Sequence, residues 1–221
     1  MKPRNAEFFN LHTHNLSTNP DERALVNQYP LEFDASIPLC SVGIHPWYIN
    51  EETLEQELAL LEHYIKLPQV AAVGECGLDK RIAVPFAIQQ QVFEAQLHLA
   101  QQIQKPVIIH CVAAFQELIA TIKKSKITVP IIIHGFSKNN TLAQQLLQQG
   151  YYLSFGKYLF QQPELAEVLA KVPQDRFFLE TDTMETGIEA VYALAAECKK
   201  MSVDQLKSTL YCTFVSVFKP V

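Results

Sequence analysis

The sequence predicts an α/β protein, a single (β/α)8 barrel of the TIM type that takes in residues 1–221. Three observations lead to this fold class. Eight short apolar runs are spaced along the chain, and longer segments with a helical spacing of apolar residues separate most of them. The length of 221 residues also fits one such domain, which typically has about 250 residues. Alternating strands and helices are equally typical of a doubly wound parallel sheet.

The predicted strands are short, rich in Val, Ile, Leu and Phe, and nearly continuous in apolar character. Strands of a parallel sheet have this composition because both of their faces are buried. In chain order the predicted strands are Phe8–His12, Ala24–Gln28, Leu39–Ile44, Val70–Gly74, Val107–His110, Ile131–His134, Tyr151–Ser154 and Phe177–Glu180.

The predicted helices place their apolar residues on one stripe. The first, Glu51–Lys66, opens with acidic residues and ends before Pro68, as helices commonly do. The others are Ala87–Gln104, Ala114–Lys124, Thr141–Gln149, Pro163–Lys171, Gly187–Met201 and a last helix from Val203 to about Phe218. Between His14 and Ala24 the chain is too short for a crossover helix. The first βα unit is therefore predicted to lack its helix, which would distort the barrel there.

Composition and charge narrow the range of functions. With 48% apolar and 19% charged residues, the chain is expected to fold around a substantial core. Its formal net charge of −5 argues against a protein that coats nucleic acid through a broad basic surface. Five cysteines without a CxxC pair, and a start without an apolar signal core, predict reduced thiols and a cytoplasmic location. Neither membrane association nor an obligate protein partner is inferred.

Side chains that can bind a metal recur where the predicted strands end. In a β/α barrel these ends surround the active site, so such residues are expected to converge. His12 and His14 point to the same face of their strand, because side chains alternate along a strand. The candidate metal ligands are His12, His14, Glu75, His110, His134 and Asp182.

This ligand set indicates two divalent ions. Imidazoles combined with carboxylates suit Zn²⁺, Mn²⁺, Fe²⁺ or Co²⁺, and Mg²⁺ is a further candidate. Six ligands exceed what one tetrahedral ion needs, whereas a pair of ions bridged by Glu75 uses them all. Two residues close in sequence to the candidate ligands and His45 each have two possible roles. Trp47 either stacks on a substrate ring or covers the pocket wall, and Glu180 either supports a ligand or is structural.

The segments that carry these residues resemble the TatD family of metal-dependent deoxyribonucleases and related hydrolases, within the amidohydrolase-like barrels. The matching motifs, in order, are NLHTH, GIHPW, VGECGLD, QQQVFEAQLHLAQQIQKPVIIHC, IIHGFS and LETD. The resemblance implies that His12, His14, Glu75 and Asp182 hold one ion, and that Glu75 bridges to a second ion held by His110 and His134. It also implies three catalytic residues: Glu75, Asp182 as the general base that takes a proton from the attacking water, and His45 as a substrate contact.

The sequence departs from the family pattern at several positions. The family usually has Asp where Asn10 stands, and Arg where Val112 stands. The Pro that usually follows the ETD motif is missing, and Thr213 replaces the usual Asn. None of these departures removes a metal ligand, so they bear on the substrate more than on the hydrolysis.

Cations near the predicted strand ends indicate an anionic substrate. Lys80, Lys138 and Lys157 follow the fourth, sixth and seventh strands, and with His45 they are the candidate substrate-binding residues. We therefore predict a phosphodiesterase or deoxyribonuclease that acts on DNA or another phosphodiester. The alternative for the same metal centre is an amidohydrolase or esterase, for example a deacylase acting on a small molecule or an aminoacyl ester. A third possibility is an inactive barrel used for binding.

Overall fold

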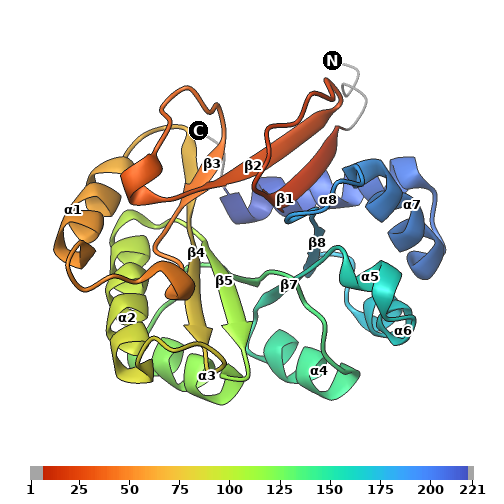
Figure 1. Cartoon of the computed structure of the whole chain (residues 1–221). Coiled ribbons are helices and arrows are strands. Elements are labelled where there is room, and N and C mark those ends of the chain that lie inside the picture. Colours follow the sequence, from red (N-terminus) through yellow and green to blue (C-terminus); the bar gives the residue numbers. More distant parts are fainter. Residues whose placement is uncertain (1–6, 219–221) are drawn as a thin grey trace. The chain divides into compact units, whose positions relative to one another are not determined.

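The computed structural model describes residues 7–218, and its eight strands are hydrogen-bonded in chain order, β1 to β8, in one sheet (Figure 1). Five neighbouring pairs, β1–β2, β3–β4, β4–β5, β6–β7 and β7–β8, are parallel. The strands are β1 (Phe8–Thr13), β2 (Glu22–Gln28), β3 (Cys40–Val42), β4 (Val70–Asp79), β5 (Val107–Val112), β6 (Ile131–Ile133), β7 (Tyr152–Phe155) and β8 (Phe177–Leu179).

The predicted helices are all present, with ends that shift by a few residues. They are α1 (Leu54–Tyr64), α2 (Phe86–Ile103), α3 (Phe115–Lys124), α4 (Asn140–Gln148), α6 (Glu164–Lys171), α7 (Ile188–Lys199) and α8 (Val203–Phe218). The structure adds the short helix α5 (Tyr158–Gln161) and the 3-10 turns η1 (Pro30–Glu32) and η2 (Pro46–Tyr48). These pieces are too short to show a periodicity in the sequence. Among the described residues, no helix combines the length and the apolar character that a membrane span requires.

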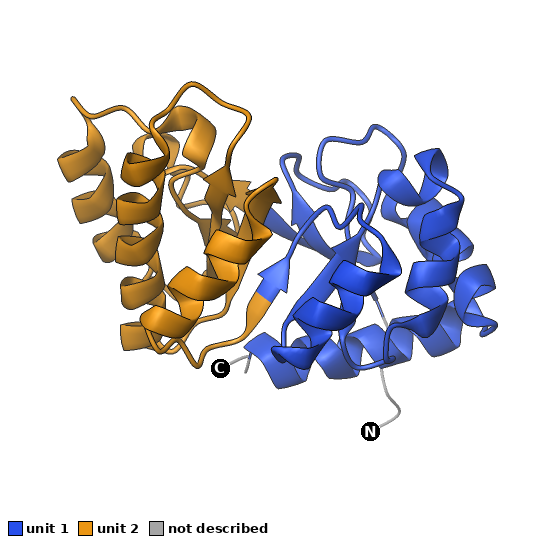
Figure 2. Cartoon of the chain, turned by 90° about the horizontal axis from the view of Figure 1, so that it is seen from below, with its two compact units in different colours: residues 1–26, 132–221 blue, residues 27–131 orange. Residues whose placement is uncertain are grey.

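The chain divides into two compact units, which we describe separately (Figure 2). Unit 1 consists of Met1–Val26 and Ile132–Val221, and unit 2 of Asn27–Ile131. The organisation of residues 1–221 as a single domain stays a prediction.

Unit 1 contains β1, β7 and β8 with α4 to α8. β7 pairs with β8 from Leu153↔Phe177 to Phe155↔Leu179, and an isolated bridge, Thr13↔Asp182, joins the end of β1 to the segment after β8. Phe9 of β1 anchors the core, because its ring lies 4.4 Å from that of Phe214 on α8. Tyr192 of α7 fixes the same residue: its hydroxyl donates to Phe9 O and accepts from Phe9 N, both at 3.0 Å.

The first βα connection is reduced, as predicted. Residues 14–21, all of which are described, contain no helix, and β2 nevertheless pairs with β1 in parallel. Side chains brace this loop: Ser17 Oγ donates to Glu22 Oε2 at 2.7 Å, and Asn19 Oδ1 accepts from Asp21 N at 2.9 Å.

Unit 2 contains β3, β4 and β5, with α2 packed on β4. β4 continues to Asp79, five residues beyond the predicted end at Gly74, because it keeps pairing with β5 as far as Asp79↔Val112. Gly77 permits this pairing. Its φ is +147°, and a Cβ there would lie 2.0 Å from the carbonyl oxygen of His110, closer than any side chain allows.

Candidate metal centre

Unit 1 gathers three of the predicted metal ligands: His12, His14 and Asp182 each offer a ligand atom within 4.8 Å of the others. His14 Nε2 lies 3.5 Å from Asp182 Oδ1, and His12 Nε2 lies 4.0 Å from the same oxygen. The His12 side chain is fully buried, and that of Asp182 is 12% exposed. We call this group the unit 1 cluster.

The backbone holds the unit 1 cluster together. Asp182 N donates to His12 O at 2.9 Å, and His14 N donates to Asp182 O at 3.2 Å. Asp182 itself has a φ of +54°, in the left-handed region that Asp tolerates better than most residues do. These backbone hydrogen bonds alone therefore hold the segment after β8 against the His-x-His segment.

Asp182 is held in its ionised form. Burial alone would raise its pKa, but the hydrogen bond with His14, the charge on His134 and the hydrogen bond from Lys157 outweigh burial, so the pKa lies well below the usual range. Lys157 Nζ lies 2.6 Å from Asp182 Oδ2. Burial lowers the pKa of Lys157, and its bond to Asp182 more than reverses this effect. Lys157, predicted as a substrate contact, thus pairs with a candidate catalytic carboxylate.

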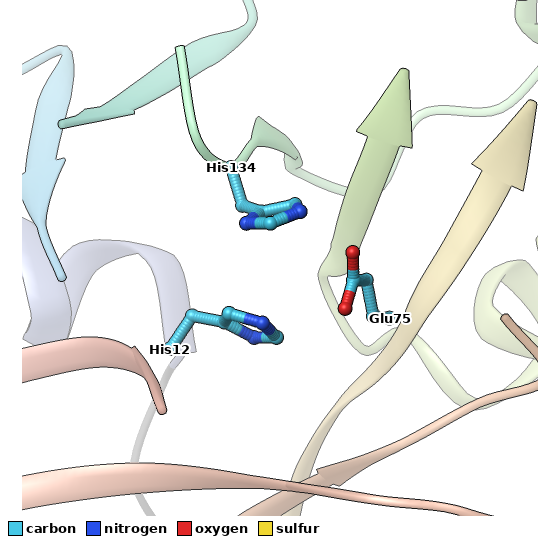
Figure 3. Close-up of side chains that lie close together, drawn as sticks. All are labelled: His12, Glu75 and His134. Atoms are coloured by element: carbon cyan, nitrogen blue, oxygen red, sulfur yellow. The ribbon is translucent and has the colours of Figure 1, made fainter. Parts of the chain in front are cut away.

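His134 stands beside the unit 1 cluster. Its ring centroid lies 4.5 Å from that of His12, and Figure 3 shows the two imidazoles side by side. Glu180 supports His134: Glu180 Oε1 lies 3.4 Å from His134 Nδ1 and accepts from Gly135 N at 2.7 Å. Of the two interpretations left open for Glu180, this geometry favours the supporting one, since a carboxylate on one ring nitrogen orients a histidine ligand.

Asn10 explains one departure from the family pattern. Its Nδ2 donates to Glu22 Oε1 at 2.7 Å and to Thr181 Oγ1 at 2.8 Å, while its Oδ1 accepts from Thr181 N at 3.0 Å. An Asp carboxylate has no hydrogen to donate to Glu22. Asn10 therefore ties β1 to the residue that precedes Asp182, and the amide is the side chain that this environment requires.

Unit 2 gathers a second group, His45, Glu75 and His110, again with ligand atoms within 4.8 Å of one another. Glu75 projects from β4 (Figure 3). Its Oε1 lies 3.2 Å from His45 Nε2 and 3.1 Å from His110 Nδ1. We call this group the unit 2 cluster. It brings His45, predicted as a catalytic residue and substrate contact but not as a metal ligand, to nearly the same distance from Glu75 as the predicted ligand His110.

Asp79 is a functional candidate that the sequence analysis did not single out. Its Oδ2 lies 3.3 Å from His110 Nε2 and accepts from Trp47 Nε1 at 2.7 Å, and its Oδ1 accepts from Arg81 N at 2.8 Å. Burial would raise its pKa, but the bonds from Trp47, Arg81 and His110 lower it overall. An ionised Asp79 thus orients the His110 ring in unit 2. The only sequence signal for this role was its position at the end of the VGECGLD motif.

Two buried glutamines of α2 position the unit 2 cluster. Gln89 accepts from Asp79 N at 2.8 Å and donates to Asp79 O at 3.0 Å. Gln96 makes the same pair of bonds with Ile44, at 2.8 Å and 3.1 Å, directly before His45. Both amides therefore act as backbone partners for loops at strand ends, which accounts for the glutamine spacing in the α2 motif.

The other predicted substrate contacts, Lys80 and Lys138, follow β4 and β6. The Lys80 ammonium pairs with Glu117 of α3 and lies 5.4 Å from the centre of the Phe86 ring. Lys138 is half-buried in the segment between β6 and α4. Trp47 is 53% exposed, and its indole N–H is bonded to Asp79. Its ring lies 5.1 Å from that of His45 and 5.6 Å from that of His110, so it covers the unit 2 cluster, and stacking on a substrate stays a prediction.

Both clusters have the chemistry of a transition-metal site. Each places two imidazoles and one carboxylate within reach of a single ion, a donor set that suits zinc and its first-row neighbours. Asp79 and Glu180 add the carboxylate–histidine contacts typical of metal centres. Fold and clusters together define a class, the β/α barrels that carry ligands for divalent metals at their strand ends.

The chain belongs to the TatD-related DNase family: the family model described as "TatD related DNase" matches residues 6–219. The chain is similar over 97–98% of its length to a TatD homologue of Escherichia coli (23% identity, TM-score 0.80, 99% of that chain) and to a TatD family hydrolase of Entamoeba histolytica (17% identity, TM-score 0.80, 99% of that chain). This similarity confirms the predicted fold class, an α/β barrel of the TIM type.

Curated relatives match shorter stretches. The "3'-5' ssDNA/RNA exonuclease TatD" of Edwardsiella piscicida is 34% identical over 64% of this chain and 56% of its own length. The protein of the same name from Citrobacter rodentium is 30% identical over 76% of this chain and 63% of its own length. The matched part of the chain thus spans less than two-thirds of either relative.

Proposed function

We propose that this protein is a divalent-metal-dependent phosphodiesterase that hydrolyses single-stranded nucleic acid from an end. The observation that carries the proposal is the pair of clusters, each with two imidazoles and a carboxylate, in a chain of the TatD-related DNase family. The substrate is suggested by the names of relatives, which are called 3'-5' exonucleases for ssDNA and RNA.

The motif resemblance implies that the proposed centre would hold two divalent ions and that Glu75 would contribute to both. The proposed ligands are His12, His14, Glu75, His110, His134 and Asp182. His45 joins them as a further candidate because it lies as close to Glu75 as His110 does. When bound, such ions lower the pKa of water and neutralise the charge that develops on an attacked phosphate.

The chain's own residues supply the proton transfer and the positioning. Asp182, ionised at neutral pH, accepts the proton of the attacking water. Glu180 and Asp79 hold the rings of His134 and His110 in fixed orientations. Lys138, Lys157 and Lys80 are the proposed contacts to the anionic substrate.

A cytoplasmic location belongs to the same proposal. All five cysteines are free, two of them buried, as expected in a reducing compartment. Cys76 follows Glu75 and is fully buried.

End-labelled single-stranded DNA and RNA, incubated with purified protein and one of Mg²⁺, Mn²⁺, Co²⁺ or Zn²⁺, test the proposal. Stepwise shortening that depends on the ion, is lost in Glu75→Ala and is kept in the exposed-surface control Glu167→Ala supports it. Protein that binds metal and cleaves neither nucleic acid contradicts it, and the next substrates to assay are amides and esters.

A further inference from the structure

Unit 2 contains a cavity of about 410 Å³ that opens beside His45. Small-molecule pockets have volumes of roughly 300–1,000 Å³, so the cavity is large enough for a small organic group. Its lining includes Tyr29, Leu31, His45, Tyr48, Asn50 and Glu57, and we call it the Tyr48 cavity. His45 therefore belongs both to the wall of this cavity and to the unit 2 cluster.

Part of the lining of the Tyr48 cavity is aromatic and apolar. The rings of Tyr29 and Tyr48 meet edge to face, with centroids 5.3 Å apart, and the Tyr48 ring lies 5.5 Å from that of His45. Tyr48 is 55% exposed and Leu31 48% exposed, so both present apolar surface to solvent beside the cavity. Exposed apolar surface beside a cavity is typical of a ligand site.

The charged residues in the lining of the Tyr48 cavity are both acidic. Glu57 is 6% exposed, and its Oε1 accepts from Thr53 Oγ1 at 2.7 Å. Glu32 adds a second carboxylate, and among the described residues the lining contains no Lys or Arg. Such a wall repels phosphate and accepts hydrogen bonds from amino groups, as a carboxylate does from the exocyclic amine of cytosine.

We propose that the Tyr48 cavity binds the nucleobase of the nucleotide at the end that is cleaved. The base stacks on Tyr48, its exocyclic amino group faces Glu57, and its phosphodiester lies towards His45. This inference rests on the proposed function, because it takes the substrate to be a nucleic acid. It deepens that function by assigning the base and the phosphate to different parts of unit 2.

Kinetics with two substrates test the proposal. One single-stranded DNA carries adenine on its 3′-terminal nucleotide, and the other is identical except that this nucleotide lacks its base. Stacking on an aromatic ring contributes on the order of 1–3 kcal/mol per base, so Tyr48→Ala is expected to lower kcat/KM about tenfold for the first substrate. The second substrate should show no such loss. Tyr48→Phe keeps the ring and should retain the wild-type preference.

The matched control is Tyr211→Ala, which removes a tyrosine of similar exposure, 46%, from α8 in unit 1. A second variant, Leu31→Ser, alters the same cavity through a different exposed side chain and guards against a folding defect in Tyr48→Ala. Equal losses on both substrates, or no loss on either, would overturn the base-binding role while leaving the nuclease function intact.

A binding measurement separates this inference from the proposed function. The probe is single-stranded DNA with 2-aminopurine at the 3′ end, titrated in EDTA so that no hydrolysis occurs, with fluorescence quenching reporting stacking. Quenching by the wild type, with a Kd about tenfold weaker in Tyr48→Ala, supports base binding in the Tyr48 cavity, even if the protein cleaves no DNA. Equal Kd values for the wild type, Tyr48→Ala and Tyr211→Ala would overturn it, even in an active nuclease.

Discussion

At the scale of residues, both clusters use carboxylates in two ways. Asp182 and Glu75 present oxygens to the imidazoles that surround a candidate ion, whereas Glu180 and Asp79 contact the ring nitrogens of single histidines. The first role follows from the sequence, because strand-end histidines and carboxylates stand out in apolar runs. The contact between Asp79 and His110 could not be predicted from the sequence. It depends on the register that pairs Asp79 with Val112, and neither strand determines that register by itself.

Asp182→Asn tests the proposed general base. The amide keeps the shape of the side chain and leaves the backbone bonds to His12 and His14 in place, but it has lost the charge and cannot accept a proton from water. We expect kcat to fall by at least about a hundredfold, with an unchanged far-UV circular dichroism spectrum. Wild-type turnover in this variant would exclude Asp182 as the base.

Asp79→Asn tests the support of His110. The amide places either its oxygen or its NH2 group at the Oδ2 position. In the first case the bond from Arg81 N is lost, in the second the Trp47 indole N–H faces another donor, and in both the negative charge opposite His110 Nε2 is removed. Loss of such a supporting partner typically weakens metal binding about 10–100-fold. Titration with Mn²⁺ or Zn²⁺ against a competing chelator measures the affinity, and Glu117→Gln, on an exposed pair in the same unit, is the control. Equal affinities in the two variants would leave Asp79 with a structural role only.

At the scale of elements, α2 links the hydrophobic core to the site. The sequence predicted its apolar stripe, and Val92, Phe93 and Leu97 are buried. The extension of β4 to Asp79 could not be predicted from the sequence. Gly74 and Gly77 are typical of loops, and their role appears only when their close approach to β5 is known. Helix α5 could not be predicted either, because its four residues are too few to show a helical period.

Gln96→Met tests the anchoring role of α2. The substitution keeps the length of the side chain but leaves the buried N–H and C=O of Ile44 without their partner. An unsatisfied buried backbone group costs about 1–3 kcal/mol, so the free energy of unfolding in urea should fall by at least about 2 kcal/mol. Gln91→Met, on the exposed face of the same helix, should change it by less than about 0.5 kcal/mol. Equal stability in the two variants would refute the anchoring role.

At the scale of the whole molecule, each compact unit carries one cluster of candidate metal ligands. The clusters draw on β1 and the segment after β8 in unit 1, and on the β3 end, β4 and β5 in unit 2. Residues far apart in the sequence could be predicted to converge because strand ends surround the active site of a barrel, and each cluster joins such residues within its own unit. The sequence did not distinguish candidate ligands from the carboxylates that support them. That distinction required the side-chain contacts of Asp79 and Glu180.

The number of ions per chain provides the molecular-scale prediction. If each cluster contributes to its own ion, His14→Ala and His110→Ala should each reduce bound metal from about two ions per chain to about one, whereas His98→Ala, an exposed histidine of α2, should leave it unchanged. Elemental analysis of protein reconstituted in Mn²⁺ or Zn²⁺ measures the stoichiometry. A ligand that binds only the folded state raises stability by about 2.7 kcal/mol at a hundred times its Kd, so each variant should also lose part of the metal-induced rise in Tm. Loss of all bound metal in both variants would instead indicate a single shared ion.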